Sequence, residues 1–133
     1  MIVVSALAAS GESGGAGMKF PRTMRLLRHA DFERVYQQGR RHFSARMTVF
    51  YLRRERGEGL RVGFTVGRAL GGAVDRNRMK RRLREAVRLQ RPANNFPVDV
   101  VINPKKSVLS AEFEDLLKEV GRAFEVVAQK TRT

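Results

Sequence analysis

The chain has 133 residues, with 27 lysines and arginines against 13 aspartates and glutamates, a formal net charge of +14 and a pI near 11.5. This length fits one domain, and the charge indicates a polyanionic partner, either nucleic acid or an anionic membrane surface. The absence of cysteine excludes disulfides and thiol catalysis and fits a reducing compartment such as the cytoplasm. Because His29 and His42 are the only histidines, we expect no classical metal site.

Residues 1–17 lack the features of folded sequence. The start "MIVVSALAAS" resembles the apolar part of a secretion signal, but no positive residue precedes it and the glycine-rich "GESGGAG" follows. No run reaches the length of about eighteen apolar residues that a membrane span needs. We therefore expect residues 1–17 to be a disordered extension, or translation to begin at Met18, and residues 18–133 to form a single domain.

The first predicted element is a short helix over residues 29–39, "HADFERVYQQG". Three apolar side chains at helical spacing share one face, namely Phe32, Val35 and Tyr36. Gly39 is a natural helix end.

Two strands are predicted next, over residues 45–53 and 61–67, because both segments alternate and are rich in β-branched and aromatic residues. In the second strand one face carries only Gly63, Thr65 and Gly67. This nearly bare face allows another group to approach the sheet closely.

The C-terminal third predicts a central strand over residues 97–103, "PVDVVIN", and a final helix. Ser110 is the expected N-cap of that helix, with Glu112 and Glu114 in its first turn. The order of helix, strands, helix, strand and helix predicts an α+β sandwich with helices packed on a sheet. The apolar stripe of the final helix comprises Phe113, Leu116, Leu117, Val120, Phe124 and Val127.

Between these elements lies the most basic stretch, residues 75–88, "DRNRMKRRLREAVR", with six arginines and one lysine. As a helix, it gathers its apolar side chains on an arc about 100° wide, enough to seat it on a sheet. The basic residues cover the adjoining flank. The apolar arc consists of Met79, Leu83, Ala86 and Val87.

This basic flank is either an ordinary solvated helix face or a surface for a polyanion. Solvated faces usually mix signs, and each like-charge pair four residues apart costs about 0.2–0.5 kcal/mol. The excess of positive charge favours an anion-binding surface, and the preference for arginine favours forked contacts to phosphate. A membrane-surface helix would have a broad apolar face, so nucleic acid is the better interpretation. Glu85 can pair with Arg81, Arg82 or Arg88, and the like-charge neighbours are Arg76–Lys80, Lys80–Arg84 and Arg84–Arg88.

Residues 61–88, "RVGFTVGRALGGAVDRNRMKRRLREAVR", resemble the signature of the bacterial ribonuclease P protein subunit. The shared pattern is a strand ending in Val-Gly, a short loop, and then Arg-Asn-Arg-x-Lys-Arg-x-x-Arg-Glu. The similarity extends to "DFERVYQQG", "MTVFYL" and "VDVVINPK" and covers about residues 22–128. It implies an α-β-β-β-α-β-α fold, like that of a ribosomal protein domain, with a mixed four-stranded sheet. It also implies a left-handed crossover through the basic helix, although crossovers are ordinarily right-handed.

The resemblance implies the protein subunit of a ribonucleoprotein that removes the 5′ leader from precursor tRNA. In that family the RNA subunit uses Mg²⁺ and performs the chemistry, so the protein would carry no catalytic residue, no metal site and no bound cofactor. The implied partners are the ribonuclease P RNA and precursor tRNA, with no membrane and no DNA. The implied RNA-binding residues are Arg68, Arg76, Asn77, Arg78, Lys80, Arg81 and Arg84, and those of the leader cleft are Phe32, Tyr36 and Phe50.

Some alternatives stay open for individual residues. Phe32 and Tyr36 also lie at core spacing, and Arg68, like Arg40 and Arg41, is either part of the groove or solvated surface. An open groove with aromatic side chains and flanking charge is typical of proteins that hold single strands without reading their sequence.

Two positions depart from the family pattern. Gly72 stands where the family usually has asparagine, which predicts a weaker start to the basic helix, with Asp75 in the first turn as an offset. Ala69 stands where a second basic residue is usual, which predicts one phosphate contact fewer.

Other functions are weighed against this interpretation. A helix-turn-helix DNA-binding protein is disfavoured because a strand precedes the basic helix, and a nuclease acting alone is disfavoured because no histidine or acidic cluster converges on the arginines. A ribosomal or other RNA-binding protein without a processing role is the main alternative.

Overall fold

A mixed four-stranded sheet lies at the centre of this computed structural model, which describes residues 28–55, 57, 59–91 and 97–131. The prediction for residues 1–17 therefore lies outside the described ranges. The strands are β1 (Arg40–Phe43), β2 (Met47–Arg53), β3 (Arg61–Phe64) and β4 (Val98–Pro104). The α-helices are α1 (His29–Gln38), α2 (Ala73–Gln90) and α3 (Phe113–Thr131), and the 3₁₀ turns are η4 (Arg68–Leu70) and η5 (Lys106–Leu109).

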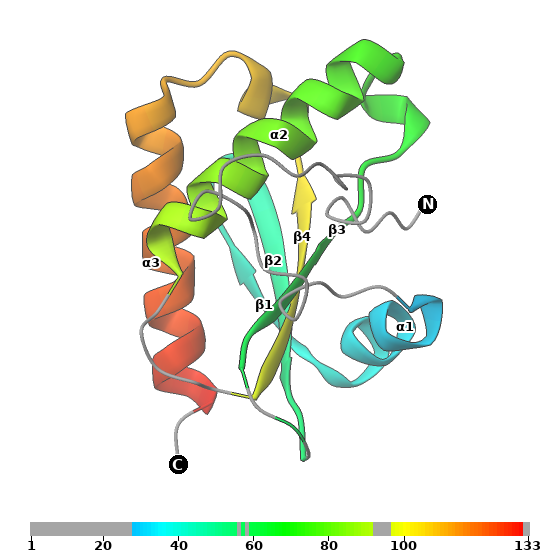
Figure 1. Cartoon of the computed structure of the whole chain (residues 1–133), viewed down its shortest axis with the longest axis vertical. Coiled ribbons are helices and arrows are strands. Elements are labelled where there is room, and N and C mark those ends of the chain that lie inside the picture. The colour runs from blue at the N-terminus through cyan, green and yellow to red at the C-terminus, as the bar shows by residue number, and fades with distance from the viewer. Residues whose placement is uncertain (1–27, 56, 58, 92–96, 132–133) are drawn as a thin grey trace, which may run out of the picture.

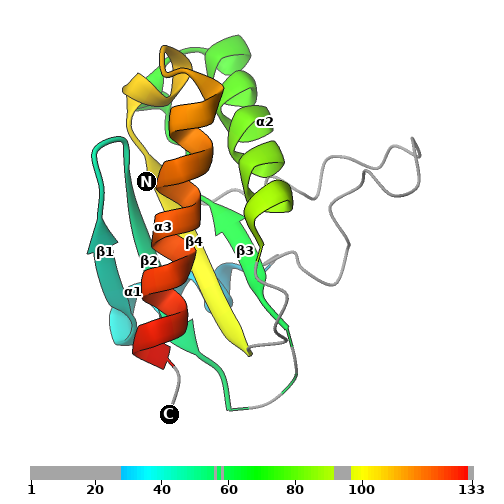
Figure 2. The same cartoon turned by 90° about the vertical axis from the view of Figure 1, so that its left-hand side faces the viewer.

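The strands lie in the order β1-β2-β4-β3, so β4 is central, as its apolar sequence predicted. β2 pairs antiparallel with β1 and β4, and β3 pairs parallel with β4. In Figure 2 the parallel strands point upward and α2 lies on the near side, joining β3 on the right to β4 on its left. The β3-α2-β4 crossover is therefore left-handed, and the α+β fold that the resemblance implied is confirmed.

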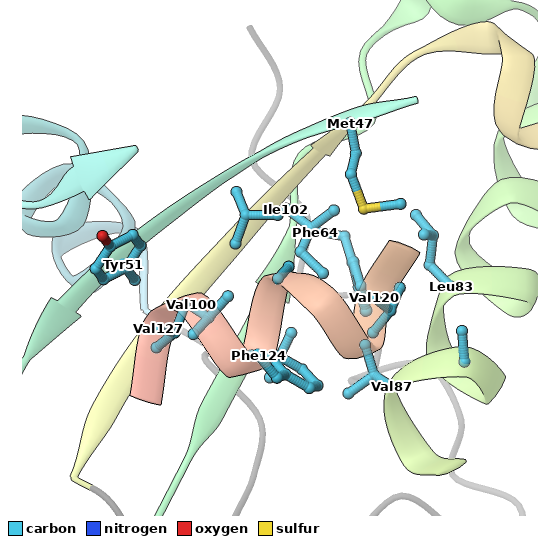
Figure 3. Packing of buried hydrophobic residues seen from close by; sticks show 14 of the residues in the cluster. Met47, Tyr51, Phe64, Leu83, Val87, Val100, Ile102, Val120, Phe124 and Val127 are labelled. Atoms are coloured by element: carbon cyan, nitrogen blue, oxygen red, sulfur yellow. The ribbon is translucent and has the colours of Figure 1, made fainter. Parts of the chain in front are cut away.

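Helices cover both faces of the sheet. α2 and α3 pack side by side on one face, and α1 packs on the other against β2 and β4 (Figures 1 and 2). The larger core lies under α2 and α3, where Phe64 and Ile102 of the sheet meet Val120 of α3 (Figure 3). The smaller core lies under α1 and is built from Phe32, Val35 and Val101.

The predicted apolar faces of α2 and α3 are both confirmed. All four residues of the α2 arc are fully buried: Met79, Leu83, Ala86 and Val87. Four residues of the α3 stripe are buried and two are partly buried against the core; the buried ones are Leu116, Val120, Phe124 and Val127, and the partly buried ones are Phe113 and Leu117. α2 can therefore expose its basic flank, because its apolar arc holds it on the molecule.

Three local predictions are corrected. The residue pattern did not reveal β1, because this edge strand is short and begins with the exposed Arg40 and Arg41. The predicted strand 61–67 ends at Phe64 as a regular strand, although the Thr65 N–H still donates to the Ile102 carbonyl. Ser110 does not cap α3, because its hydroxyl donates to the Ser107 carbonyl at the end of η5.

The start of α2 has the weak cap that the sequence predicted. Gly72 is the N-cap, no side chain caps the helix, and Asp75 lies in the first turn. A Cβ added at Gly72 would meet no atom within 4 Å, and its backbone is extended, so an asparagine fits there. Gly72→Asn should therefore raise the free energy of unfolding by a few tenths of a kcal/mol, about the difference between glycine and asparagine as N-caps. Urea denaturation will measure this gain, and a loss of stability would contradict the cap geometry.

Candidate nucleic-acid interface

The basic flank of α2 is at least partly accessible at the surface. Asn77, Arg78 and Arg81 are exposed, and Lys80 is half-buried. In the described ranges, no ion pair joins Arg76, Arg78, Lys80 or Arg81 to an acidic side chain. Partial burial lowers the pKa of Lys80, and repulsion by its neighbours Arg76 and Arg84 lowers it further. The repulsion that the sequence indicated between Lys80 and its neighbours Arg76 and Arg84 is therefore present in the structure.

Two other arginines of α2 make contacts within the protein, Arg82 with the segment before α3 and Arg88 with its own helix. Arg82 donates a hydrogen bond to the Ala111 carbonyl, and its guanidinium carbon lies 6.0 Å from the Phe113 ring centroid. Arg88 pairs with Glu85 and donates from Nε to Oε1 at 3.2 Å, so Arg88 is the partner of Glu85 among those the sequence allowed. This hydrogen bond lowers the pKa of Glu85. The basic residues are thus sorted into structural ones and ones that face outward.

The loop before α2 brings Arg68 to the N-terminal end of the helix. η4 packs against α2, and Arg68 is exposed. Gly71 has a φ of 133°, and a Cβ there would lie 3.1 Å from the Asp75 carboxylate, so this turn requires glycine. Ala69, which replaces the usual basic residue, is exposed and adds no charge here.

On the opposite face of the sheet, Tyr36 of α1 and Phe50 of β2 form an aromatic pair. Their ring centroids are 4.8 Å apart with planes at 89°, and both side chains are half-buried. The Tyr36 hydroxyl shares a hydrogen bond with the Thr65 hydroxyl and donates to Asn103 Oδ1 at 3.0 Å. Burial raises the pKa of the Tyr36 phenol. The two rings therefore border a polar strip of the sheet and retain surface for a partner.

Phe32, the third predicted cleft residue, is completely buried. A Cβ added at Gly63 would lie 2.3 Å from Phe32 Cζ, so the ring occupies the bare face that the glycine leaves on β3. The group that approaches the sheet most closely is thus the protein's own side chain. Phe32 supports α1 from beneath, and contact with a leader would require it to leave this position.

A buried ionic network, which the residue pattern did not indicate, ties α1 to the sheet. Asp99 of β4 is fully buried and receives hydrogen bonds from Arg54 Nη1 at 2.7 Å and from Arg61 Nε and Nη2, each at 2.8 Å. Arg61 also lies 3.8 Å from Asp31 Oδ1 on α1. The hydrogen bond to Asp99 raises the pKa of Arg61. One carboxylate therefore links the end of β2, strand β3 and, through Arg61, helix α1.

Within the same described ranges, no three histidine, cysteine, aspartate or glutamate side chains gather as a group that could hold a metal ion. None of the described helices is long and apolar enough to cross a membrane.

Comparison with known proteins assigns the family. The family model described as Ribonuclease P matches residues 20–128. The chain belongs to the ribonuclease P protein family. The ribonuclease P protein component of Symbiobacterium thermophilum is 42% identical over 101 residues, which cover 76% of this chain and 88% of that protein. The component of Chloroflexus aggregans is 42% identical over 102 residues, covering 76% of this chain and 75% of the relative.

Solved structures of this family share the fold. The RNase P protein from Thermotoga maritima matches with a TM-score of 0.67 at 23% identity, covering 75% of this chain and 94% of that one. The Staphylococcus aureus RNase P protein matches with a TM-score of 0.67 at 20% identity, covering 77% and 93%.

Membership in the ribonuclease P protein family confirms the role of a protein component in a tRNA-processing endoribonuclease complex. A ribosomal protein, or an RNA-binding protein without a processing role, is not favoured. The roles of individual residues stay predictions, and the structure separates them by exposure. The α2 residues and Arg68 are at least partly accessible, Tyr36 and Phe50 are half-buried, and Phe32 is enclosed.

Proposed function

We propose that this protein assists a catalytic RNA that itself holds Mg²⁺ and cleaves the 5′ leader from precursor tRNA in the cytoplasm. In this proposal the protein binds the ribonuclease P RNA with α2 and holds the leader in the cleft between α1 and the sheet. It contributes no catalytic residue, no metal ligand and no cofactor.

The observation that carries this proposal is the charge arrangement of α2. Arg76, Lys80 and Arg84 follow one another at four-residue spacing, so the free protein bears their mutual repulsion. RNA phosphates would relieve that repulsion, and binding would release the counterions condensed on the RNA. Arginine suits this role because its planar guanidinium matches two phosphate oxygens.

The side chains that α1 and the sheet present side by side support the second part of the proposal. Tyr36 and Phe50 present aromatic surface, and Asn103 and Thr65 supply polar groups beside them. Single-strand sites combine stacking on aromatic rings with flanking positive charge, and each stacked base contributes about 1–3 kcal/mol. A leader of any sequence can use such a site, because every base has a planar face.

Arg76→Ala and Arg81→Ala should each weaken binding of the ribonuclease P RNA and flatten its salt dependence. Each loses about one phosphate contact, so the slope of log K against log[salt] should fall by about 0.7–0.9 per substitution. Binding titrations at several salt concentrations measure the slope.

Arg122→Ala is the matched control for these variants. It removes the same charge from α3, where Arg122 is 68% exposed and pairs with Glu125. If all three variants change the slope equally, the effect is one of net charge, and the proposed role of α2 is contradicted.

A further inference from the structure

Phe43, the last residue of the edge strand β1, is an exposed aromatic residue that the proposed cleft does not use. Phe43 is 69% exposed, and in the described part of the chain the only other exposed large hydrophobic residues are Val74 and Leu89, both on α2. A partner that covers this ring would remove apolar surface from water, which favours binding.

Phe43 is joined to the cleft by an arginine. The Arg41 guanidinium carbon lies 5.8 Å from the Phe43 ring centroid and 5.9 Å from the Phe50 ring centroid. Phe50 in turn meets Tyr36 edge to face. Four planar groups from β1, β2 and α1 therefore follow one another without a break, from the sheet edge to the cleft.

The strand register places these groups on one face of the sheet. Arg41 is paired with Phe50, and Phe43 is paired with Thr48, which is paired with Asn103. Paired residues of neighbouring strands project to the same side. Phe43 thus lies in line with Asn103, whose side chain accepts the hydrogen bond from Tyr36.

We propose that Phe43 and Arg41 form an additional subsite for a nucleotide of single-stranded RNA, extending the leader cleft to the edge of the sheet. The base would stack on the exposed Phe43 ring, and Arg41, itself exposed, would meet the adjoining phosphate or a second base. This inference rests on the proposed function, because it lengthens the same cleft.

A second copy of the chain is the other candidate to cover Phe43, through pairing of two β1 edges. Charge repulsion disfavours such a dimer. Arg40 and Arg41 are both exposed on β1 and would face the same two charges on the second copy. Positive charge at a sheet edge opposes edge pairing but attracts RNA.

The test measures how tightly the holoenzyme binds precursor tRNA when the leader is shortened one nucleotide at a time. The holoenzyme is reconstituted from a bacterial ribonuclease P RNA with the wild-type protein or with Phe43→Ala. With a long leader, Phe43→Ala should weaken binding roughly 5- to 150-fold, the equivalent of one stacked base. With the shortest leaders the two proteins should bind equally, because the nucleotide that reaches Phe43 is then absent.

Two further variants sharpen this test. Phe43→Tyr keeps a planar ring and should retain most of the affinity. Phe43→Leu keeps an apolar side chain without a ring and should lose nearly as much affinity as Phe43→Ala. Because Phe43 is exposed, its substitution should leave the midpoint of urea unfolding nearly unchanged, so affinity is compared between folded proteins.

The outcomes separate this inference from the proposed function. If the wild-type protein gives no dependence on leader length, the leader cleft is wrong and this subsite falls with it. If the wild-type protein does depend on leader length but Phe43→Ala binds equally at every length, the subsite alone is overturned. It is also overturned if sedimentation shows that Phe43→Ala dissociates a dimer while leader affinity is unchanged.

Discussion

Asp99→Ala should lower the free energy of unfolding by about 3–5 kcal/mol, because it breaks a buried ion pair by removing one partner. Asp99 is fully buried, and the side chain of Arg54 that it binds is only 12% exposed. Arg54 keeps its hydrogen bond to the Gly59 carbonyl, but the charges of Arg54 and Arg61 would lose their carboxylate. The desolvation of both guanidinium groups would then lack the charge of Asp99, which offsets it in the wild-type protein.

The same substitution should also loosen α1. Arg61 pairs with Asp99 in the sheet and also lies near Asp31 on α1. Without Asp99, Arg61 is no longer held in place, and the sheet loses a link to the helix that carries Tyr36. Leader affinity should therefore fall in any fraction that remains folded.

Chemical denaturation followed by circular dichroism measures the effect of Asp99→Ala. Glu125→Ala, which removes one partner of an ion pair with both side chains 68% exposed, is the control and should change stability by less than about 0.5 kcal/mol. If the free energy of unfolding fell by less than about 1 kcal/mol, water or rearrangement would be compensating the arginines, and the structural role given to Asp99 would be contradicted.

Phe32→Ala should cost about 3–5 kcal/mol, the usual effect of deleting a buried aromatic ring. The ring is fully buried between α1 and the sheet, against Val35, Val101 and the open face of Gly63. Phe43→Ala is the matched comparison, because that ring is 69% exposed and its loss should be nearly neutral for stability.

A double-mutant cycle with Gly63→Ala tests the close approach itself. In the wild-type background the new Cβ would lie 2.3 Å from Phe32 Cζ, so Gly63→Ala should cost about 1–3 kcal/mol by overpacking. In the Phe32→Ala background that space is empty, and the same change should be nearly neutral. A coupling energy near zero would show that Phe32 does not lie on Gly63.

Periodic patterns predicted most of the fold. The arc of Met79, Leu83, Ala86 and Val87 is buried as predicted, because a helix turned toward a core must bury one stripe. Strand β1 escaped the residue pattern, because an edge strand exposes most of its side chains and has little apolar alternation to show. The left-handed crossover came only from the family resemblance, since general chain statistics favour the other hand.

The site was predictable where charge or composition marks it, and not where tertiary placement decides. The excess of positive charge on α2 follows directly from its sequence. Phe32 and Tyr36, in contrast, share one helix face, and only the structure shows that one is enclosed and the other accessible. The residue pattern does not show that Asp99 is buried and paired, because its arginine partners lie far away in sequence. The proposed role of Phe43 could not be predicted from the sequence, because it depends on the pairing of β1 with β2 and on the contact between Arg41 and the Phe43 ring.

In the proposed function, this protein assists an RNA that performs the cleavage. The most direct measurement reconstitutes the chain with a bacterial ribonuclease P RNA at low Mg²⁺ and follows release of the 5′ leader from precursor tRNA. We predict no cleavage by the protein alone, slow cleavage by the RNA alone and faster cleavage by the two together, because the positive surface of the protein offsets phosphate repulsion when Mg²⁺ is scarce. The proposed function would be contradicted if the protein alone cleaved the substrate, or if adding the protein left the cleavage rate of the RNA unchanged.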